Sequence, residues 1–241
     1  MLIQQIIASL QPDVLCLQET NGFDSLDQRL LKTFGHKLQY PYHAFSACGT
    51  QGKNYSVATY TRFPITRFET LPGFRHAGLI TAIDTPKAKV VVGNVLLSDK
   101  SDDERINELR IATNALESSE SKIICGDHNM LSSWDSYATF LVKTFNEKQR
   151  TRFTKEDRLD FRAAQYLATV DYKDVAEITR TKDAWTVRTK MSTAEGHPNC
   201  ARLDYFFVSP SLVNKVRSLQ TLRTTHTDRA SDHYPVLLTL E

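Results

Sequence analysis

The sequence predicts an α/β or α+β protein in which helices cover the faces of β-sheets. Short apolar runs separated by polar turns recur along the chain, and such runs are typical of strands. Between some of them, apolar residues return every three or four positions, which is typical of amphipathic helices. We find neither an internal repeat nor a Gly/Ser-rich linker, so we expect one domain over residues 1–241.

The expected elements follow one another along the whole chain. The first is a helix with its apolar residues on one face: Leu2, Ile3, Ile6, Ile7 and Leu10. The expected strands are 13–17, 54–60, 89–97, 122–126, 202–208 and 234–240, and further helical spacing covers 103–117 and 158–170. Several of the strand runs are continuously apolar rather than alternating, which indicates strands buried on both faces.

Composition narrows the functional classes. The formal net charge is +2, which favours no particular partner. None of the four cysteines lies in a CxxC pair, so we do not expect a zinc site. Cys16 and Cys125 lie in apolar runs and behave there as small hydrophobes, which indicates a reducing, intracellular compartment: the cytoplasm, or the nucleus in a eukaryote. No apolar run approaches membrane-spanning length, and the N-terminus lacks the basic region of a signal peptide, so we expect no membrane partner.

Polar side chains gather where the expected strands begin or end. They are Glu19, Asp127, Asn129, Asp232 and His233. Open sheets build their sites at such positions. Carboxylate and amide oxygens with one imidazole suit Mg²⁺ or Mn²⁺ better than zinc.

Each of these positions also has a simpler reading. Glu19 can be a solvated carboxylate at a strand end or a cation ligand. "GDHN" can be an Asx turn, or it can place Asp127 and Asn129 on one side to activate a water and bind a reacting oxygen. His128 points elsewhere and receives no role.

Asp204 lies in the apolar run "RLDYFFV", and a buried carboxylate needs a partner. That partner can be Arg202 or another arginine in a structural ion pair. It can also be an imidazole that the carboxylate orients, and His233 is the candidate. The adjacent Asp232 and His233 are therefore either a surface turn or half of an active site.

Four segments together resemble a known family. "PDVLCLQET", "KIICGDHN", "RLDYFFVSPSL" and "SDHYPVLL" resemble successive signatures of the endonuclease/exonuclease/phosphatase superfamily, and "AWTVRT" and "RFTKEDR" resemble its exonuclease III and AP endonuclease branch. The resemblance runs from about residue 11 to the C-terminus and is weakest over 21–90. It implies a DNase I-like, four-layer α/β/β/α sandwich of two mixed sheets and a divalent-metal-dependent phosphodiesterase.

The resemblance also implies residue roles. Glu19 and Asp232 would hold Mg²⁺ or Mn²⁺. Asp127 would position or deprotonate the attacking water, and Asn129 would hold that water or the phosphate. Asp204 would orient His233, which would contact the scissile phosphate.

The sequence departs from the family at several points. The family's first strand, with its Asn, has no counterpart, so we expect an unpaired edge on a neighbouring strand. Residues 95–97 are aliphatic where the family offers a Tyr or His. Val187 and Ala201 stand where the branch has the aromatic residues of an abasic-sugar pocket. "NYSVATY" lacks the family's Gly, but its Tyr55 could meet a nucleic-acid backbone.

A basic segment suggests a partner. Residues 148–162 hold six basic and three acidic residues, and are either a solvated surface or a contact for phosphates. With Tyr55 and Arg202 as substrate-binding residues, we expect a monomer that binds duplex DNA through its backbone. The leading hypothesis is a nuclease of the AP endonuclease or exonuclease III type acting in DNA repair. The alternatives are a phosphodiesterase or phosphatase acting on a small phosphoester, and an inactive remnant that binds nucleic acid.

Overall fold

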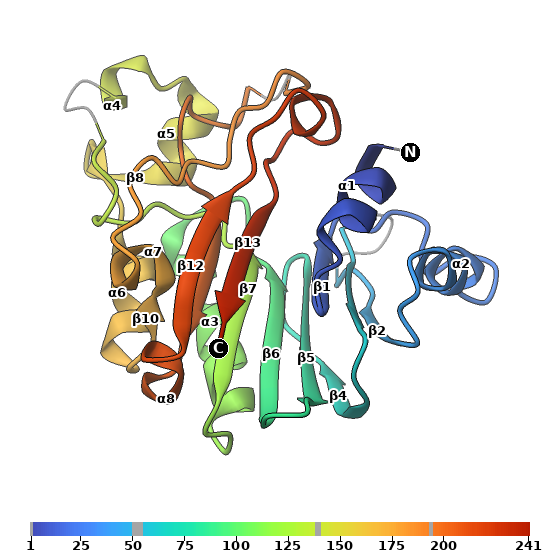
Figure 1. Cartoon of the computed structure of the whole chain (residues 1–241). Helices are drawn as coiled ribbons and strands as arrows, with labels where there is room; N and C mark the ends of the chain where they lie inside the picture. The colour runs from blue at the N-terminus through green and yellow to red at the C-terminus, as the bar shows by residue number, and fades with distance from the viewer. Residues whose placement is uncertain (1, 50–54, 138–140, 193–194) are drawn as a thin grey trace.

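The computed structural model of the chain describes residues 2–49, 55–137, 141–192 and 195–241 (Figure 1). Its helices are α1 (Leu2–Leu10), α2 (Arg29–Lys37), α3 (Asp102–Leu116), α4 (Leu141–Thr144), α5 (Glu147–Phe153), α6 (Arg162–Thr169), α7 (Val175–Ile178), α8 (Pro210–Val213) and the 3₁₀ turn η1 (Thr227–Arg229). Its strands are β1 (Val14–Gln18), β2 (Tyr42–Ser46), β3 (Val57–Thr61), β4 (Ile65–Thr70), β5 (Ala77–Asp84), β6 (Lys89–Leu96), β7 (Lys122–Asp127), β8 (Thr154–Lys155), β9 (Arg158–Leu159), β10 (Lys173–Asp174), β11 (Asp204–Val208), β12 (Val216–Thr221) and β13 (Val236–Leu240).

The larger sheet is mixed and has the strand order β10-β11-β7-β6-β5-β4. Only β6 and β7 are parallel; the other neighbours are antiparallel. Its central strands are apolar on both faces, as the continuous runs predict. Val95 and Ile124 pack on one side of the sheet, and Val92 and Cys125 pack on the other. The strands are therefore held by cores on both sides.

Helices α3 and α6 cover the first face of this sheet. The apolar residues spaced along them, including Leu109, Leu116 and Leu167, join the cluster that contains Val95 and Ile124. The side chain of Ser101 caps α3 by accepting a hydrogen bond from the backbone of Glu104. The two helices predicted from the spacing of apolar residues thus form one outer layer of the molecule.

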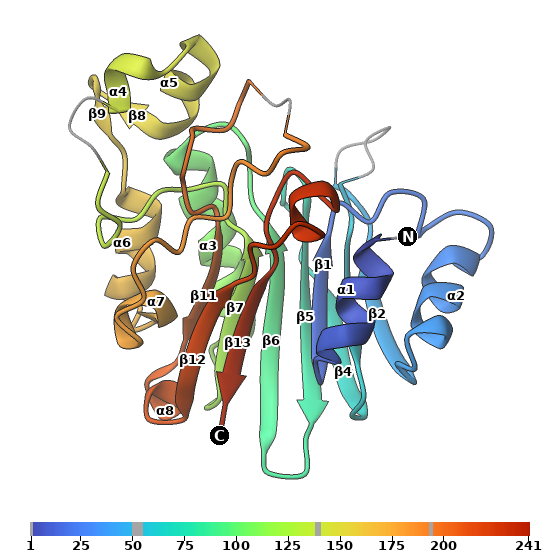
Figure 2. The same cartoon turned by 45° about the horizontal axis from the view of Figure 1, so that its top comes forward.

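The second face is covered by two smaller sheets, β1-β3-β2 and β12-β13, and α1 and α2 pack outside the first of them (Figures 1 and 2). The layers are thus those of the expected α/β/β/α sandwich. Among the described residues, β1 pairs only with β3, and β13 only with β12. The residues of β1 are half-buried, whereas those of β3, which has neighbours on both sides, are all buried. Both β1 and β13 therefore carry an unpaired edge of the expected kind.

Most of the expected elements form, with shifted boundaries. The first helix spans its expected residues, and α6 begins at Arg162 because residues 158–159 form a small hairpin with 154–155. The sequence did not predict β2, β4, β5 and β12, nor the two-residue strands β8, β9 and β10. Five of the six residues of β4, for instance, are exposed, so no apolar run marks it. In the described part of the chain, no helix is long and apolar enough to cross a membrane.

Candidate active site

The predicted site residues come from four separate strand ends that meet at one end of the sheets, the top in both views (Figures 1 and 2). Asp204, at the start of β11, lies directly opposite Asp127, at the end of the antiparallel β7. Glu19 follows β1, and Asp232 and His233 come shortly before β13. Strand direction is what brings them together, because the carboxyl ends of β1 and β7 lie beside the amino ends of β11 and β13.

Asp204 and His233 form the ion pair that the sequence offered as one alternative. Nδ1 of His233 lies 2.8 Å from Oδ2 of Asp204, and both side chains are less than one fifth exposed. Burial alone would lower the pKa of His233, but the charge and hydrogen bond of Asp204, together with the charges of Asp127 and Asp232, outweigh burial and raise this pKa to about 10. The imidazole is therefore cationic at neutral pH, with Nε2 as the nitrogen that can meet an anion.

Asp127 is buried at the end of β7, close to this ion pair. Burial raises its pKa to about 7, and the charge of Asp204 adds to the rise, whereas His233 opposes it. The preceding Gly126 has a φ of +125°, and a Cβ at this position would lie 2.1 Å from the carbonyl oxygen of Val95. Only glycine allows this approach to β6, so Gly126 sets the position of the carboxylate.

Asn129 is buried beside Asp127. Its backbone N–H donates to Oδ1 of Asp127 at 2.9 Å, and its Nδ2 donates to the carbonyl of Leu97 at 2.9 Å. Its Oδ1 accepts a hydrogen bond from Arg152. These bonds fix the amide of Asn129 next to the carboxylate of Asp127. This geometry is compatible both with a structural Asx turn and with a role of Asn129 in binding a water or a phosphate.

Glu19 and Asp232 are the carboxylates expected to hold a cation. Solvent reaches Glu19, yet the surrounding protein raises its pKa, and the charge of Asp232 raises it further. A cation between the two would offset this repulsion, and the hard oxygen donors of carboxylates suit Mg²⁺ or Mn²⁺. The residues present therefore fit a divalent cation.

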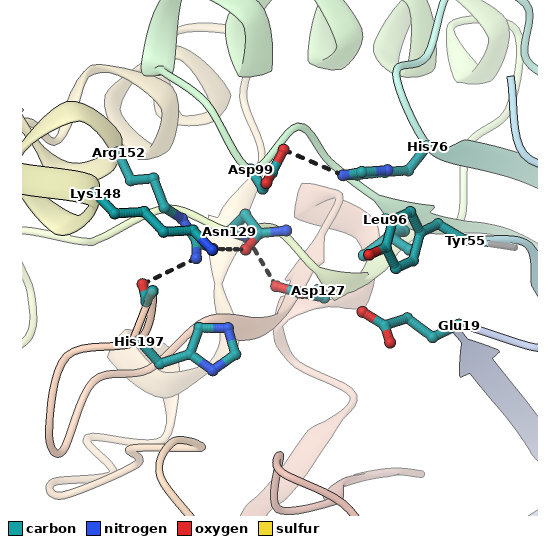
Figure 3. A pocket seen from close by; sticks show the side chains of 11 residues that line it. Glu19, Tyr55, His76, Leu96, Asp99, Asp127, Asn129, Lys148, Arg152 and His197 are labelled. Atoms are coloured by element: carbon teal, nitrogen blue, oxygen red, sulfur yellow. Dashed lines mark hydrogen bonds and ion pairs between the residues drawn. The ribbon is translucent and has the colours of Figure 1, made fainter. Parts of the chain in front are cut away.

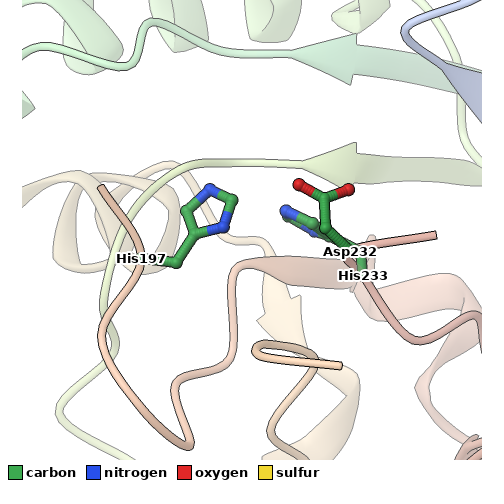
Figure 4. Close-up of side chains that lie close together, drawn as sticks. All are labelled: His197, Asp232 and His233. Atoms are coloured by element: carbon green, nitrogen blue, oxygen red, sulfur yellow. The ribbon is translucent and has the colours of Figure 1, made fainter. Parts of the chain in front are cut away.

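Among the described residues, two groups of three side chains have ligand atoms that all lie within 4.8 Å of one another. One is Asp127, Asp204 and His233, and the other is His197, Asp232 and His233 (Figure 4). Both groups include His233. Since a protonated imidazole cannot ligate a metal, the charge of His233 argues against its acting as a ligand. The carboxylates remain the better candidates.

A pocket of about 140 Å³ opens beside Asp127 and His197, and Asp204, Asp232 and His233 are not among its lining residues (Figure 3). Its lining residues come from distant parts of the chain and are Glu19, Tyr55, His76, Leu96, Asp99, Asp127, Asn129, Lys148, Arg152, Gly196 and His197. Tyr55 thus lies on the pocket wall, and its role in substrate binding stays a prediction. Leu96 occupies part of the wall where the family offers a Tyr or His.

A second imidazole and carboxylate lie on the wall near Tyr55. Nε2 of His76 is 3.5 Å from Oδ1 of Asp99, and the ring of Tyr55 meets that of His76 edge-on at 4.8 Å. The hydrogen bond from His76 holds the pKa of Asp99 well below its usual range. His76 and Asp99 therefore bring a second imidazole to the pocket, although the sequence offers only aliphatic residues at 95–97.

His197 lies against the catalytic candidate His233, with ring centroids 4.9 Å apart (Figure 4). Burial lowers the pKa of His197 to about 3, and the charge of His233 lowers it further. The ring is therefore neutral at physiological pH. Its Nδ1 has no hydrogen-bond partner within the described ranges, which leaves one polar atom next to the pocket unsatisfied.

Arg202 lies outside the pocket, and its position argues against the substrate contact predicted for it. Its guanidinium makes two hydrogen bonds to Asp174, at 2.8 and 2.6 Å, and one to Asp135 at 3.0 Å. Its side chain is only 2% exposed. The arginine is therefore committed to a buried ion-pair network and does not pair with Asp204.

We expect Arg202→Met to lower the free energy of unfolding by about 3–5 kcal/mol, because it leaves two buried carboxylates without their counter-charge. Urea denaturation measures this change. Arg67→Met is the matched control, since Arg67 forms an exposed pair with Glu69 and its loss should change stability by less than about 0.5 kcal/mol. Unchanged stability of Arg202→Met with lost turnover would restore a role in substrate binding.

Sequence reasoning missed several pocket residues. Lys148 and Arg152 lie within the basic segment 148–162. Both side chains point into the pocket because both lie on one face of α5, a helix that the sequence analysis did not predict. His76 lies outside the basic segment and outside the motifs described above. His197 carries no sequence signal, because its loop has neither strand nor helix periodicity.

Comparisons with known proteins agree with the fold described above. Similar solved structures include a 3′ phosphatase, NExo, from Neisseria bound to a product DNA hairpin (TM-score 0.73, 17% identity, 99% of this chain and 93% of that chain). They also include an AP endonuclease from Archaeoglobus fulgidus (TM-score 0.72, 17% identity, 99% and 93%) and an endonuclease/exonuclease/phosphatase family protein from Leptotrichia buccalis (0.69, 19%, 100% and 91%). At these identities the likeness shows the fold.

No curated protein matches the sequence. The model of the Endonuclease/Exonuclease/phosphatase family, however, matches residues 2–233, which is nearly the whole chain. The chain therefore belongs to the endonuclease/exonuclease/phosphatase family.

Proposed function

We propose that the protein is a divalent-metal-dependent phosphodiester hydrolase, and that it acts on DNA as a repair nuclease of the AP endonuclease or exonuclease III type. The observation that carries this proposal is the pairing of a cationic His233 with Asp204 beside Asp127, whose pKa lies near neutrality. A base whose pKa lies near the working pH, next to a cationic hydrogen-bond donor, is typical of acid–base sites. Similar structures named as a 3′ phosphatase bound to a DNA hairpin and as an AP endonuclease support DNA as the substrate.

The residues suggest distinct roles in hydrolysis. Asp127, with a pKa of about 7, accepts a proton from the attacking water, and Asn129 fixes that water or the phosphate beside it. The His233 imidazolium hydrogen-bonds a non-bridging phosphate oxygen as negative charge develops there. Asp204 holds the imidazole in place and keeps it protonated.

Glu19 and Asp232 would hold the Mg²⁺ or Mn²⁺ ion. When bound, such an ion neutralises charge on the phosphate and on the leaving oxygen. Tyr55 lies on the pocket wall, where it would contact the phosphate backbone of a bound duplex. We propose that the protein binds DNA as a monomer.

Cleavage of a labelled duplex containing one abasic analogue, compared with an intact duplex, tests the proposal. We expect incision with Mg²⁺ or Mn²⁺, none with EDTA, and weaker activity as the salt concentration rises, because phosphate contacts release counterions. His233→Ala should abolish incision. Metal-independent incision would contradict the proposed mechanism, and DNA binding without cleavage under any divalent metal would identify an inactive remnant.

The second candidate function is hydrolysis of a small phosphoester. It is favoured by the positions of Val187 and Ala201, which are fully buried in one cluster with Phe153 of α5. These residues form a closed apolar core rather than an open aromatic pocket for a sugar. Turnover of a small phosphoester with little salt dependence, without incision of DNA, would decide for this candidate.

A further inference from the structure

Strand β4 forms one edge of the larger sheet (Figures 1 and 2). Within the described ranges it pairs only with β5, so one side of its backbone has no strand beside it. Every residue of β4 after Ile65 is exposed, and Phe68 in particular is 57% exposed. An uncovered edge strand that carries an exposed aromatic residue can pair with a further strand.

The free backbone groups of β4 belong to alternate residues. The N–H of Leu71, the residue after β4, donates to the carbonyl of Gly78 at 2.9 Å. Hydrogen-bonded and non-bonded positions alternate in antiparallel strands, so Glu69 also turns its N–H and C=O to β5, whereas Phe68 and Thr70 direct theirs away from it. The N–H and C=O of Phe68 can therefore exchange hydrogen bonds with a strand beyond the edge.

The charges of β4 are placed symmetrically about Phe68. Arg67 precedes it and Glu69 follows it, and the two charged side chains share one face of the strand because they are two residues apart. They form an ion pair within the strand at 2.7 Å, with side chains 58% and 45% exposed. Such an exposed pair contributes little to stability, so either charge can change its partner at little cost. Edge strands often avoid association through charges that repel a second strand, but β4 carries one charge of each sign.

We propose that β4 is the surface through which two copies of this chain associate, each pairing its β4 antiparallel with that of the other about a two-fold axis at Phe68. In this register Phe68 lies opposite the partner's Phe68, and Arg67 lies opposite the partner's Glu69. Aromatic pairs and pairs of opposite charge are both favourable across antiparallel strands. The register also gives the free N–H and C=O of Phe68 their hydrogen bonds, so the backbone and the side chains require the same alignment.

The neighbouring registers are less favourable. A symmetric pairing keeps the alternation of backbone hydrogen bonds only if it is centred on another residue of β4. Centred on Arg67, it places two arginines directly opposite each other, and centred on Glu69, it places two glutamates there. Like charges directly opposite each other are destabilising. The charges of β4 therefore select the register in which Phe68 meets the partner's Phe68.

The association leaves the site of each copy complete. None of the residues that line the pocket belongs to β4, so the proposal that a single copy acts on each DNA site is unaffected. The two larger sheets become one continuous sheet that crosses the two-fold axis. One pair of short strands is a small interface, so we expect a dissociation constant on the order of 100 μM.

Charge reversal tests this inference with the full chain. Sedimentation equilibrium from about 10 to about 1,000 μM protein measures the dissociation constant. Arg67→Glu places like charges opposite each other at both symmetric positions, so we expect it to raise this constant about tenfold or more, and Glu69→Arg should do the same. A mixture of the two variants should associate about as tightly as the natural chain, because each negatively charged strand then meets a positively charged one.

Arg217→Glu is the matched control. Arg217 is an exposed arginine of another strand, β12, and it also forms an ion pair, with Glu241. The substitution changes the net charge by the same amount as Arg67→Glu and should leave the dissociation constant unchanged. Circular dichroism checks that each variant is folded.

Amide hydrogen exchange locates the surface in the natural chain. The N–H groups of Phe68 and Thr70 should exchange more slowly at high than at low protein concentration, because pairing gives them acceptors. A natural chain that stays single up to about 1 mM would overturn the inference. Association that Arg67→Glu leaves unchanged, or that slows exchange elsewhere but not in β4, would also overturn it. None of these measurements requires catalysis, so their outcome is independent of the proposed function.

Discussion

Replacing His233 by alanine is expected to lower kcat for phosphoester hydrolysis by about 10³-fold, because the phosphate loses a preorganised cationic donor. The effect should fall on kcat and kcat/KM together, since the interaction strengthens as charge develops on phosphate. Initial rates with saturating Mg²⁺ measure it, and circular dichroism checks that the variant is folded.

Asp204→Asn keeps the imidazole ring of His233 in the protein but removes the carboxylate that keeps this ring protonated. Because the Asp204 carboxylate raises the pKa of His233 to about 10, the asparagine variant should lower that pKa toward its ordinary value of 6.5. Histidine NMR titration in EDTA should show His233 protonated at pH 8 in the natural protein and neutral in Asp204→Asn. If His233 titrates near pH 6.5 in both proteins, the ion pair does not control its charge.

The same ion pair makes stability depend on pH. The folded-state pKa of His233 lies above the unfolded value of 6.5, so its contribution is complete below pH 6.5 and is lost as the pH rises through about 10. Asp127 acts in the same direction at lower pH: its contribution is complete below pH 3.8 and is lost as the pH rises through about 7. The metal-free protein should therefore lose stability steadily from mildly acidic to alkaline pH.

Asp127→Asn is expected to abolish turnover and yet to stabilise the metal-free protein at pH 8. Activity should fall by about 10³-fold or more, because the variant has no group to accept the proton of the attacking water. Stability should rise on the order of 2 kcal/mol, because the natural side chain is a buried carboxylate that is ionised at this pH against its environment. Urea denaturation in EDTA at pH 4 and pH 8 measures the second effect.

The two pH values supply the control for this variant. At pH 4 the natural Asp127 is protonated and neutral in the folded state, so Asp127→Asn should differ little from it. Asn129 can keep its backbone hydrogen bond, since the asparagine oxygen at 127 can accept it in the same position. Equal stability at pH 8, or a larger gain at pH 4, would show that burial does not raise the pKa of Asp127 as described.

Both predictions depend on two neighbouring groups whose pKa values both lie above their ordinary values. His233 gains a proton affinity that keeps it cationic, and Asp127 is brought to a pKa at which it can accept a proton near neutral pH. The causes of the two raised pKa values differ. His233 has Asp204 at hydrogen-bond distance, and the negative charge of Asp204 stabilises the imidazolium. The same charge repels the ionised form of Asp127, whose pKa is raised mainly by burial. One carboxylate thus affects both groups, which makes Asp204 as important to the site as the residues that would contact the substrate.

The sequence by itself determined the class of the fold, its strongest strands and the candidates for chemistry. Continuous apolar runs predict β6 and β7 because strands buried on both faces must be apolar on both. "GDHN" and "SDH" were recognisable because polar residues next to such strands are costly to bury without a purpose. Weak elements escaped prediction: β4 is mostly exposed, and α5 lies in a segment that reads as a charged surface.

Only the tertiary structure decided which charges meet. Asp204 had two possible partners in the sequence. In the fold it lies opposite Asp127 on β7 and pairs with His233, while Arg202 turns to Asp174. The same holds for Lys148 and Arg152, whose direction depends on how α5 packs against the loop of His197. A pairwise interaction between charges depends on distances of a few ångströms across the fold, and local patterns in a sequence carry no information about such distances.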